Sequence, residues 1–262
     1  MNNLKKIKDF EEVKRVSQVY DNRAKVTDSI GAAGQWGSKK LVDQITQEII
    51  KKIELKKEDQ VLEIGCGSGV LGNVIRKNCN VYFGFDASRL MLKKFQTEYS
   101  NEVTSNLIQA SATQIPFKDN FFDKVIMNGV SMYFPNKKFL FNVLNEIKRV
   151  SNNDSLIFIG ENIVPSRYHW ELVWFQNLPA FLQLIAKPYI KFRKWLSNNI
   201  TYLAGKWKYS HKDISVKIVQ NFFRNNGRFF ISDSASYEIR KKLYGKNVRG
   251  NRRMDFIIKL KK

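Results

Sequence analysis

The chain has 262 residues, 43% of them hydrophobic, enough for one large domain or, as we favour, one domain with a substantial insertion. Its 45 Lys and Arg against 24 Asp and Glu give a net charge of +21, which attracts nucleic acid, anionic membranes or anionic metabolites, unless the lysine enrichment has no functional meaning. Two cysteines and two histidines provide no disulfide framework and almost no ligands for a structural zinc ion, so we expect no metal.

The N-terminal part is predicted to be helical. Residues 10–30 and 37–53 have helical spacing, and Leu41, Ile45, Ile49 and Ile53 recur every four positions in the second segment. The glycine-rich residues 31–37 between them indicate a loop or lid hinge. Residues 1–12 lack the apolar core of a signal peptide, so we expect a cytoplasmic protein.

The most informative stretch is an apolar strand, residues 61–64, that ends on three glycines, Gly65, Gly67 and Gly69. Glycine permits positive φ and carries no Cβ, so the backbone at this turn can lie against a small molecule. Asp86 follows a second apolar run, residues 81–85, where a carboxylate can accept hydrogen bonds from the vicinal hydroxyls of a ribose. The pair predicts a site for an adenosine-type cofactor.

Downstream, predicted strands and helices alternate. A helix from Leu71 precedes the strand at 81–85, and further elements are predicted at 88–99 (helix), 105–109 and 124–128 (strands), 139–150 (helix) and 155–161 (strand). Such alternation builds a parallel sheet from right-handed crossover units. Ligands then bind at the carboxyl ends of the strands, where Gly65, Asp86, Ser111 and Asn128 are expected to converge.

Residues 165–209 do not continue this alternation of strands and helices. They are aromatic-rich with helical spacing, and no acidic residue occurs from 172 to 212. This amphipathic segment suits a lid over a substrate, ordinary packing on the sheet, or contact with an anionic membrane. A helix from Ser210 to Phe223 and strands at 229–231 and 254–260 are predicted to follow, with a basic run at 240–253 that is either solvated or holds phosphate.

The spacing Gly-x-Gly-x-Gly, preceded by Glu63, differs from the dinucleotide fingerprint Gly-x-Gly-x-x-Gly. It resembles motif I of the class I S-adenosylmethionine-dependent methyltransferases. The segments 111–117 and 121–128 are similar to the adenine-contacting segment and fourth strand of that family, although Ser111 stands where the family often has Asp. The resemblance covers residues 55 to 165 well. A structural glycine turn or an NAD-binding fold is the weaker interpretation.

The resemblance implies an α/β, Rossmann-like, seven-stranded and mostly parallel sheet with helices on both faces. Residues 1–54 would form N-terminal helices and a cofactor lid, 55–165 and 210–262 the methyltransferase core, and 166–209 a helical insertion serving as substrate lid. S-adenosylmethionine would be the cofactor and S-adenosylhomocysteine the product. The implied cofactor-binding residues are Glu63, Gly65, Gly67, Gly69, Asp86, Ala87, Ser111, Ala112 and Asn128.

The sequence says less about which residues bind the methyl acceptor. Tyr20, Tyr133 and Trp174 are candidates for substrate binding, and His169, His211 and Glu161 for a general base, which hydroxyl acceptors usually need. The Asn-Pro-Pro-Tyr or Asp-Pro-Pro-Tyr tetrapeptide of nucleobase and glutamine methylases does not follow the fourth strand, where residues 128–131 read Asn-Gly-Val-Ser.

We therefore expect a methyltransferase acting on a small-molecule or lipid-like acceptor, anionic if the charge is functional. RNA methylation is the alternative, because the basic run and the aromatic insertion would grip phosphates and bases. A non-catalytic binding protein with the same fold is a further alternative. Peripheral contact with the inner membrane surface is the fourth, and salt-reversible sedimentation with anionic vesicles would reveal it.

Overall fold

The computed structural model describes residues 2–33, 38–99, 106–163, 216–244 and 253–261. They form a seven-stranded sheet with the strand order β3-β2-β1-β4-β5-β7-β6. Only the pairings of β7 are antiparallel, so the sheet is mostly parallel and the fold is the predicted Rossmann-like α/β arrangement. The strands are β1 (Gln60–Ile64), β2 (Val81–Asp86), β3 (Leu107–Gln109), β4 (Phe122–Asn128), β5 (Ser151–Ile163), β6 (Gly227–Asp233) and β7 (Arg253–Leu260).

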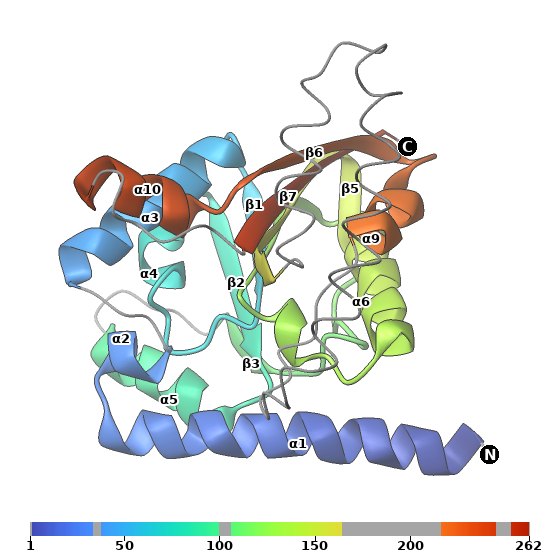
Figure 1. The fold of residues 1–262 in the computed structure, drawn as a ribbon, viewed down its shortest axis with the longest axis horizontal. Helices are drawn as coiled ribbons and strands as arrows, with labels where there is room; N and C mark the ends of the chain where they lie inside the picture. The colour runs from blue at the N-terminus through green and yellow to red at the C-terminus, as the bar shows by residue number, and fades with distance from the viewer. Residues whose placement is uncertain (1, 34–37, 100–105, 164–215, 245–252, 262) are drawn as a thin grey trace, which may run out of the picture.

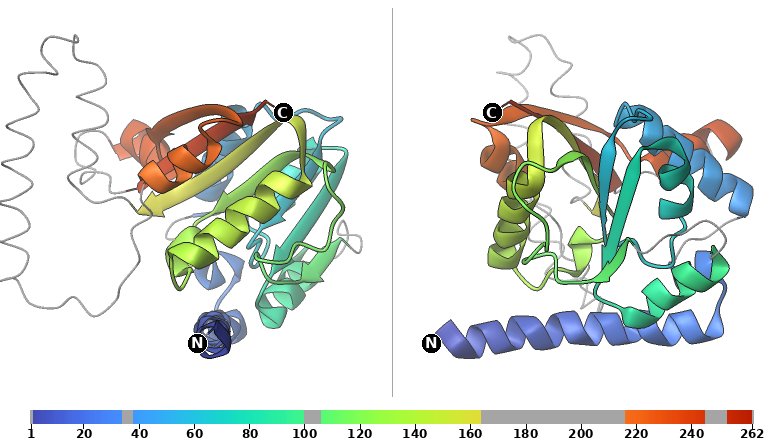
Figure 2. Two further views of the ribbon diagram at one scale, coloured as in Figure 1. Left: turned by 90° about the vertical axis from the view of Figure 1, so that its right-hand side faces the viewer. Right: turned by 180° about the vertical axis from the view of Figure 1, so that it is seen from behind.

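Helices cover both faces of the sheet (Figures 1 and 2). One face packs against α6 (Lys137–Val150) and α9 (Val216–Phe223). The other face packs against α3 (Lys39–Lys52), α4 (Gly72–Ile75), α5 (Arg89–Glu98) and α10 (Ala235–Tyr244). Two short 3-10 helices follow α4 and β4, at Arg76–Asn78 and Ser131–Tyr133.

The alternation of side chains along β1 explains the two cores. Leu62 and Ile64 belong to the core under α6 and α9, whereas Val61 belongs to the core under α3, α4 and α5. Successive side chains in a strand point to opposite faces, so Glu63 shares the face of Val61. It is a carboxylate on a mostly apolar face of the sheet, and only 2% exposed.

The N-terminal helix α1 (Asn2–Val26) is a long rod along one edge of the molecule, beside α5 (Figures 1 and 2). The sequence predicts one helix over residues 10–30, but the structure breaks it into α1 and the short α2 (Ser29–Ala32). The break follows from Asp28, which is extended and accepts a hydrogen bond from Gly31 N–H as the cap of α2.

The sequence reading also missed α10, which lies between β6 and β7 where only a basic run was expected. Its apolar residues Ala235 and Ile239 are buried under the sheet, and Ser234 Oγ accepts from Tyr237 N–H at its start. Strands β4 and β5 both extend further than predicted. The insertion at 166–209, the start of the helix predicted from Ser210 and most of the run at 240–253 lie outside the described residues or are described only in part.

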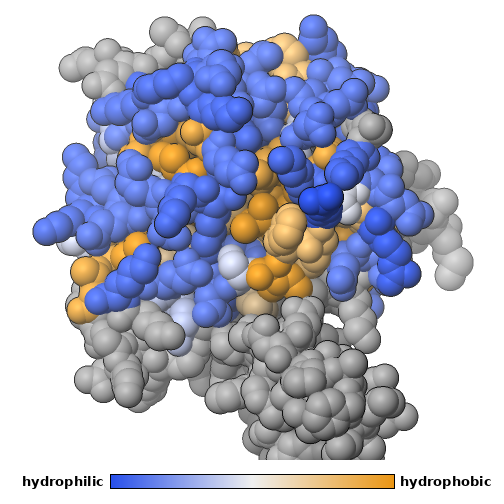
Figure 3. Space-filling view, turned by 90° about the horizontal axis from the view of Figure 1, so that it is seen from above, coloured by the Kyte–Doolittle hydropathy of each residue, from blue (hydrophilic) through white to orange (hydrophobic). Residues whose placement is uncertain are grey.

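The face seen from above is dominated by hydrophilic side chains, with apolar side chains visible between them (Figure 3). In the described parts of the chain, no helix combines the length and apolar character needed to cross a membrane.

Candidate active site

A cavity of about 170 Å³ lies at the carboxyl ends of β1, β2 and β4, beneath α1. Its lining includes most of the residues that the sequence singled out: Tyr20, Glu63, Gly65, Gly67, Asp86, Ala87, Ser111, Ala112, Asn128 and Tyr133. Gly69 lies in the adjoining turn, and Glu161 is not part of the lining. Parallel strands thus bring together residues far apart in sequence at one edge of the sheet, as expected for this class of fold.

All three motif glycines have a positive φ, at +71° for Gly65, +53° for Gly67 and +81° for Gly69. A Cβ on Gly65 would lie 2.4 Å from Val130 Cγ2, and one on Gly69 would lie 2.1 Å from the Phe95 ring. The turn therefore requires glycine both for its backbone conformation and for close packing. The result is exposed main chain along one side of the cavity.

Asp86 joins this turn to the end of β2. Its Oδ2 accepts from Gly67 N–H at 2.9 Å and its Oδ1 from Ser88 N–H at 2.8 Å. Burial raises the pKa of Asp86, and these backbone hydrogen bonds counteract that rise. Each carboxylate oxygen can accept a second bond, so the fixed carboxylate suits a ligand with paired hydroxyls.

A clamp that the sequence reading missed holds the segment after Ser111. Arg149 on α6 donates to Ile115 O at 2.8 Å and to Phe117 O at 2.7 Å, while Glu146 Oε2 accepts from Ile115 N–H. Arg149 also pairs with Glu146, which lowers the pKa of Glu146. The wall formed by Ser111 and Ala112 is thereby tied to α6. The only sequence signal was a pair of opposite charges three residues apart on a helix.

One part of the cavity lining, here called the aromatic end, is aromatic and apolar. Tyr20 on α1 donates to the Tyr133 hydroxyl at 2.6 Å, and the two rings meet edge to face at 5.6 Å. Burial and the neighbouring Tyr133 raise the pKa of Tyr20, so its hydroxyl stays protonated. Apolar side chains from α1, from the segment after β4 and from α6 complete the aromatic end: Val13, Val16, Val130, Phe134 and Phe139.

Asp21 fastens α1 beside the cavity. Its Oδ1 accepts from the Ser88 hydroxyl and from Leu90 N–H, at the start of α5. The N-terminal segment is also tied to the glycine turn, because Ser68 Oγ donates to Ser29 O at 2.7 Å. Helix α1 therefore contacts the start of α5 and Tyr133, while α2 contacts the glycine turn.

Asn128 ends β4, and Glu161 lies beside it near the end of β5, since Asn128 lies opposite Gly160 in the register of the two strands. Asn128 Oδ1 and Glu161 Oε1 are both buried without a hydrogen-bond partner in the described structure. A buried acceptor without a partner is costly, so these oxygens suit a ligand or water that donates hydrogen bonds.

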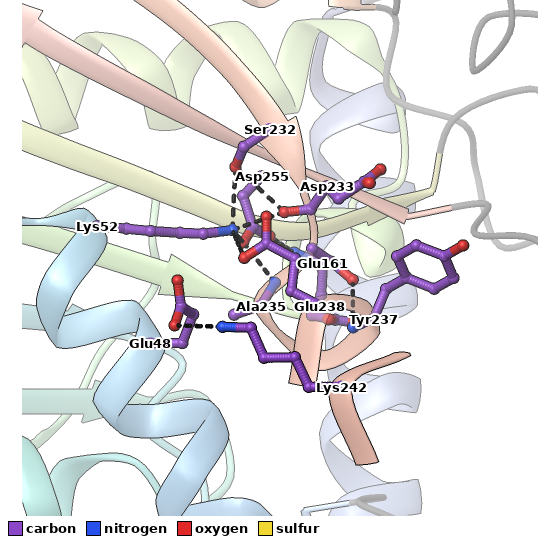
Figure 4. A network of polar contacts seen from close by, with 11 residues as sticks. Glu48, Lys52, Glu161, Ser232, Asp233, Ala235, Tyr237, Glu238, Lys242 and Asp255 are labelled. Atoms are coloured by element: carbon purple, nitrogen blue, oxygen red, sulfur yellow. Dashed lines mark hydrogen bonds and ion pairs between the residues drawn. The ribbon is translucent and has the colours of Figure 1, made fainter. Parts of the chain in front are cut away.

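A network of charges holds Glu161 in place (Figure 4). Glu161 has a φ of +56° at a bulge in β5, its N–H donates to Asp255 Oδ1 at 3.0 Å, and its Oε2 pairs with Arg253 at 2.8 Å. Asp255 also accepts from Lys52 at 3.0 Å and from Ala235 N–H. Lys52 in turn lies 3.3 Å from Glu238. Burial raises the pKa of Asp255 to about 6 against the opposing effect of Lys52, so Asp255 is ionised at neutral pH.

Three predicted residues, His169, His211 and Trp174, lie outside the described residues. Their roles stay predictions. Within the described ranges, no cluster of three or more His, Cys, Asp or Glu side chains is arranged to hold a metal ion.

The comparisons with known proteins agree with this geometry. A family model described as a methyltransferase domain matches residues 62–159. An uncharacterised protein of Methanocaldococcus jannaschii is 27% identical over 196 residues, which cover 70% of this chain and 81% of the relative. Demethylmenaquinone methyltransferase of Geobacillus kaustophilus is 25% identical over 61% of this chain and 70% of its own length.

Among solved structures, phosphoethanolamine N-methyltransferase 1 of Haemonchus contortus, in complex with phosphoethanolamine and S-adenosylhomocysteine, superposes with a TM-score of 0.62. The match covers 95% of this chain and 49% of that one at 11% identity, which shows a shared fold. The glycine turn, Asp86 and the buried acceptor oxygen of Asn128 fit the sugar and amino-acid parts of S-adenosylmethionine. The chain contains a class I S-adenosylmethionine-dependent methyltransferase domain and is an S-adenosylmethionine-dependent methyltransferase.

Proposed function

We propose that the methyl acceptor is a small-molecule or lipid-like compound that binds at the aromatic end of the cavity. The observation that carries this proposal is the apolar wall formed by Val13, Val16, Val130, Phe134 and Phe139 beside the glycine turn. Such a wall favours a compound with apolar surface, because burying that surface supplies binding energy. The few polar groups nearby, from Tyr20 and Tyr133, would orient it.

The cofactor residues follow from the same cavity. Asp86 would hold the ribose hydroxyls, Ala87, Ser111 and Ala112 would flank adenine, and the glycine turn would lie along the methionine part. Asn128 Oδ1 and Glu63 would serve the ammonium group of that part, Glu63 directly or through water.

When bound, S-adenosylmethionine supplies an activated methyl group on a positively charged sulfur, whose departure leaves a neutral thioether. The protein's task is then mainly to align the acceptor, and alignment contributes about 7–11 kcal/mol to lowering a barrier of this kind. A hydroxyl acceptor also needs a base. Glu161 is our candidate among the described residues, because Oε1 is buried and has no partner while Oε2 is held by Arg253.

The experiment that tests the proposal incubates the purified protein with methyl-labelled S-adenosylmethionine and separate metabolite, lipid and RNA fractions of a cell extract. We expect label in the metabolite or lipid fraction, and its loss in Asp86→Ala. Glu58→Ala is the matched control, because Glu58 is an exposed carboxylate away from the cavity. Label confined to the RNA fraction would overturn the proposal and establish the alternative.

The net charge of +21 is the observation that recommends RNA as that alternative. Two described members of the basic run have acidic partners, since Arg253 pairs with Glu161 and Lys242 lies 3.6 Å from Glu48. This pairing reduces the charge available for phosphate, and RNA therefore stays second.

A further inference from the structure

The carboxylate of Glu63 is paired with a tyrosine that no motif includes. Tyr82 on β2 donates its hydroxyl to Glu63 Oε2 at 2.6 Å. Both residues are buried, with exposures of 2% for Glu63 and 6% for Tyr82. The register of β1 and β2 pairs Val61 with Tyr82 and Glu63 with Gly84, so both polar side chains lie on the face covered by α3, α4 and α5.

Two glycines outside the motif leave the space that this pair occupies. A Cβ on Gly72 of α4 would lie 2.3 Å from the Tyr82 hydroxyl and 2.9 Å from Glu63 Oε2, and a Cβ on Gly84 would lie 2.8 Å from the same hydroxyl. Neither glycine has a positive φ, so their backbone conformation does not require glycine. The absence of side chains at these two glycines therefore leaves room for the hydrogen bond between Tyr82 and Glu63.

Glu63 faces few charges. Burial raises its pKa to about 8, with Asp86 raising it further and the Tyr82 hydrogen bond lowering it. Cys66 of the glycine turn faces the pair as well, and burial raises the pKa of its thiol, so it is neutral. Burial also raises the pKa of Tyr82. In the empty protein at pH 7, Glu63 is therefore mainly protonated and Tyr82 is a neutral hydrogen-bond donor.

We propose that Tyr82 is a positioning residue for Glu63, and that the binding of the cofactor's ammonium group expels a proton from Glu63. The proposal rests on the role toward that ammonium proposed above. A cation at the cavity edge favours the carboxylate, and the Tyr82 hydroxyl stabilises the same charged form. No covalent bond changes: the carboxyl proton passes to the buffer, and the cofactor keeps its own ammonium protons.

The test is calorimetric titration of the full chain with S-adenosylhomocysteine from pH 6 to 8 in buffers of different ionisation enthalpy. A group with a pKa of about 8 should release about 0.9 proton on binding at pH 7. The affinity should rise by about fifty-fold between pH 6 and pH 8, since the proton no longer competes. The matched ligand is 5′-methylthioadenosine, which lacks the ammonium and should bind with little pH dependence and no proton release.

Two variants separate positioning from a structural role. Tyr82→Phe removes only the hydroxyl, so the pKa of Glu63 should rise, the affinity curve for S-adenosylhomocysteine should move to higher pH, and methylthioadenosine binding should stay unchanged. Glu63→Gln should abolish proton release and leave only the titration of the ligand itself.

Wild-type binding of S-adenosylhomocysteine without proton release would overturn the proposal, even if the variants fail to fold. The proposal would also be overturned if Tyr82→Phe weakened the binding of S-adenosylhomocysteine and of methylthioadenosine equally and left proton release unchanged. The Tyr82 hydroxyl would then contribute only to packing. No methyl acceptor is needed, so the outcome is separable from that of the acceptor experiment.

Discussion

Replacing the positive-φ glycines one at a time by alanine tests how closely the cofactor turn is packed. The relevant positions are Gly69, Gly67 and Gly129, with φ values of +81°, +53° and +69°. Alanine in the left-handed region costs about 1–2 kcal/mol at each of them. The three sites differ in what the added Cβ would meet, so the series separates backbone strain from steric overlap.

At Gly129 the nearest atom to an added Cβ is 4.0 Å away, and only the backbone cost applies. At Gly67 the neighbour is Met91 Cε at 3.2 Å, the end of a flexible side chain that can move. At Gly69 the Cβ would lie 2.1 Å from the Phe95 ring, which is fully buried and held by edge contacts with Tyr82 and Tyr99. Overpacking typically adds about 1–3 kcal/mol, which gives about 2–5 kcal/mol in total for Gly69→Ala.

Urea unfolding should therefore rank the losses of stability as Gly69→Ala, then Gly67→Ala, then Gly129→Ala. Phe95→Leu in the Gly69→Ala background should recover part of the loss, because the smaller side chain admits the Cβ. If Gly69→Ala and Gly129→Ala lose equal stability within about 0.5 kcal/mol, the close packing of the turn onto α5 is refuted.

Lys52→Met should lower the free energy of unfolding by about 3–5 kcal/mol, because the substitution leaves Asp255 buried without its cation. Adding Asp255→Leu to Lys52→Met should restore part of the lost stability in urea unfolding. If the stability losses of the two single variants simply add in the double variant, the pairing is contradicted. Without cofactor, Glu63→Gln should stabilise the protein by about 2 kcal/mol more at pH 8 than at pH 6. The pKa of Glu63 is raised to about 8 in the folded protein, so its carboxyl group favours unfolding more strongly as the pH rises from about 4.5 to 8. Urea unfolding of both proteins at pH 6 and pH 8 measures this difference in stability. An equal effect of the substitution at the two pH values would argue against the raised pKa of Glu63. Tyr133→Phe should speed proteolysis of α1 by severalfold by removing the hydroxyl bond to Tyr20, and an unchanged cleavage rate would show that this bond does not hold the helix.

The glycine turn and its carboxylate were predictable because their sequence signals are local. A strand ending on Gly65, Gly67 and Gly69, followed by Asp86 at the end of the next strand, encodes the turn and its carboxylate within a short stretch of chain. The parallel sheet was predictable for the same reason, because short apolar runs alternate with helical segments along the chain. Chain order alone then brings strand ends together, since parallel strands joined by crossovers share an edge.

Residues whose partners come from other elements were not predictable. Tyr82 reads as one more apolar residue of a buried strand, and its bond to Glu63 becomes visible only with the register of β1 and β2. Arg149 reads as a charge on the outside of an amphipathic helix, yet it holds the carbonyls of Ile115 and Phe117. Both contacts depend on tertiary placement, which periodicity does not encode.

The same distinction explains why the surroundings of Glu161 were not predictable from the sequence. The bulge at Glu161 depends on Asp255 of β7, and Asp255 depends on Lys52 of α3, 203 residues earlier in the chain. Nothing in the neighbourhood of Glu161 in the sequence predicts its left-handed backbone or its partners. The aromatic end likewise joins Tyr20 of α1 to Tyr133, 113 residues apart. Contacts between distant parts of the chain thus assemble the surroundings of Glu161 and the Tyr20–Tyr133 pair, whereas one short stretch of chain encodes the glycine turn. It follows that the sequence identifies the methyl donor more readily than the acceptor.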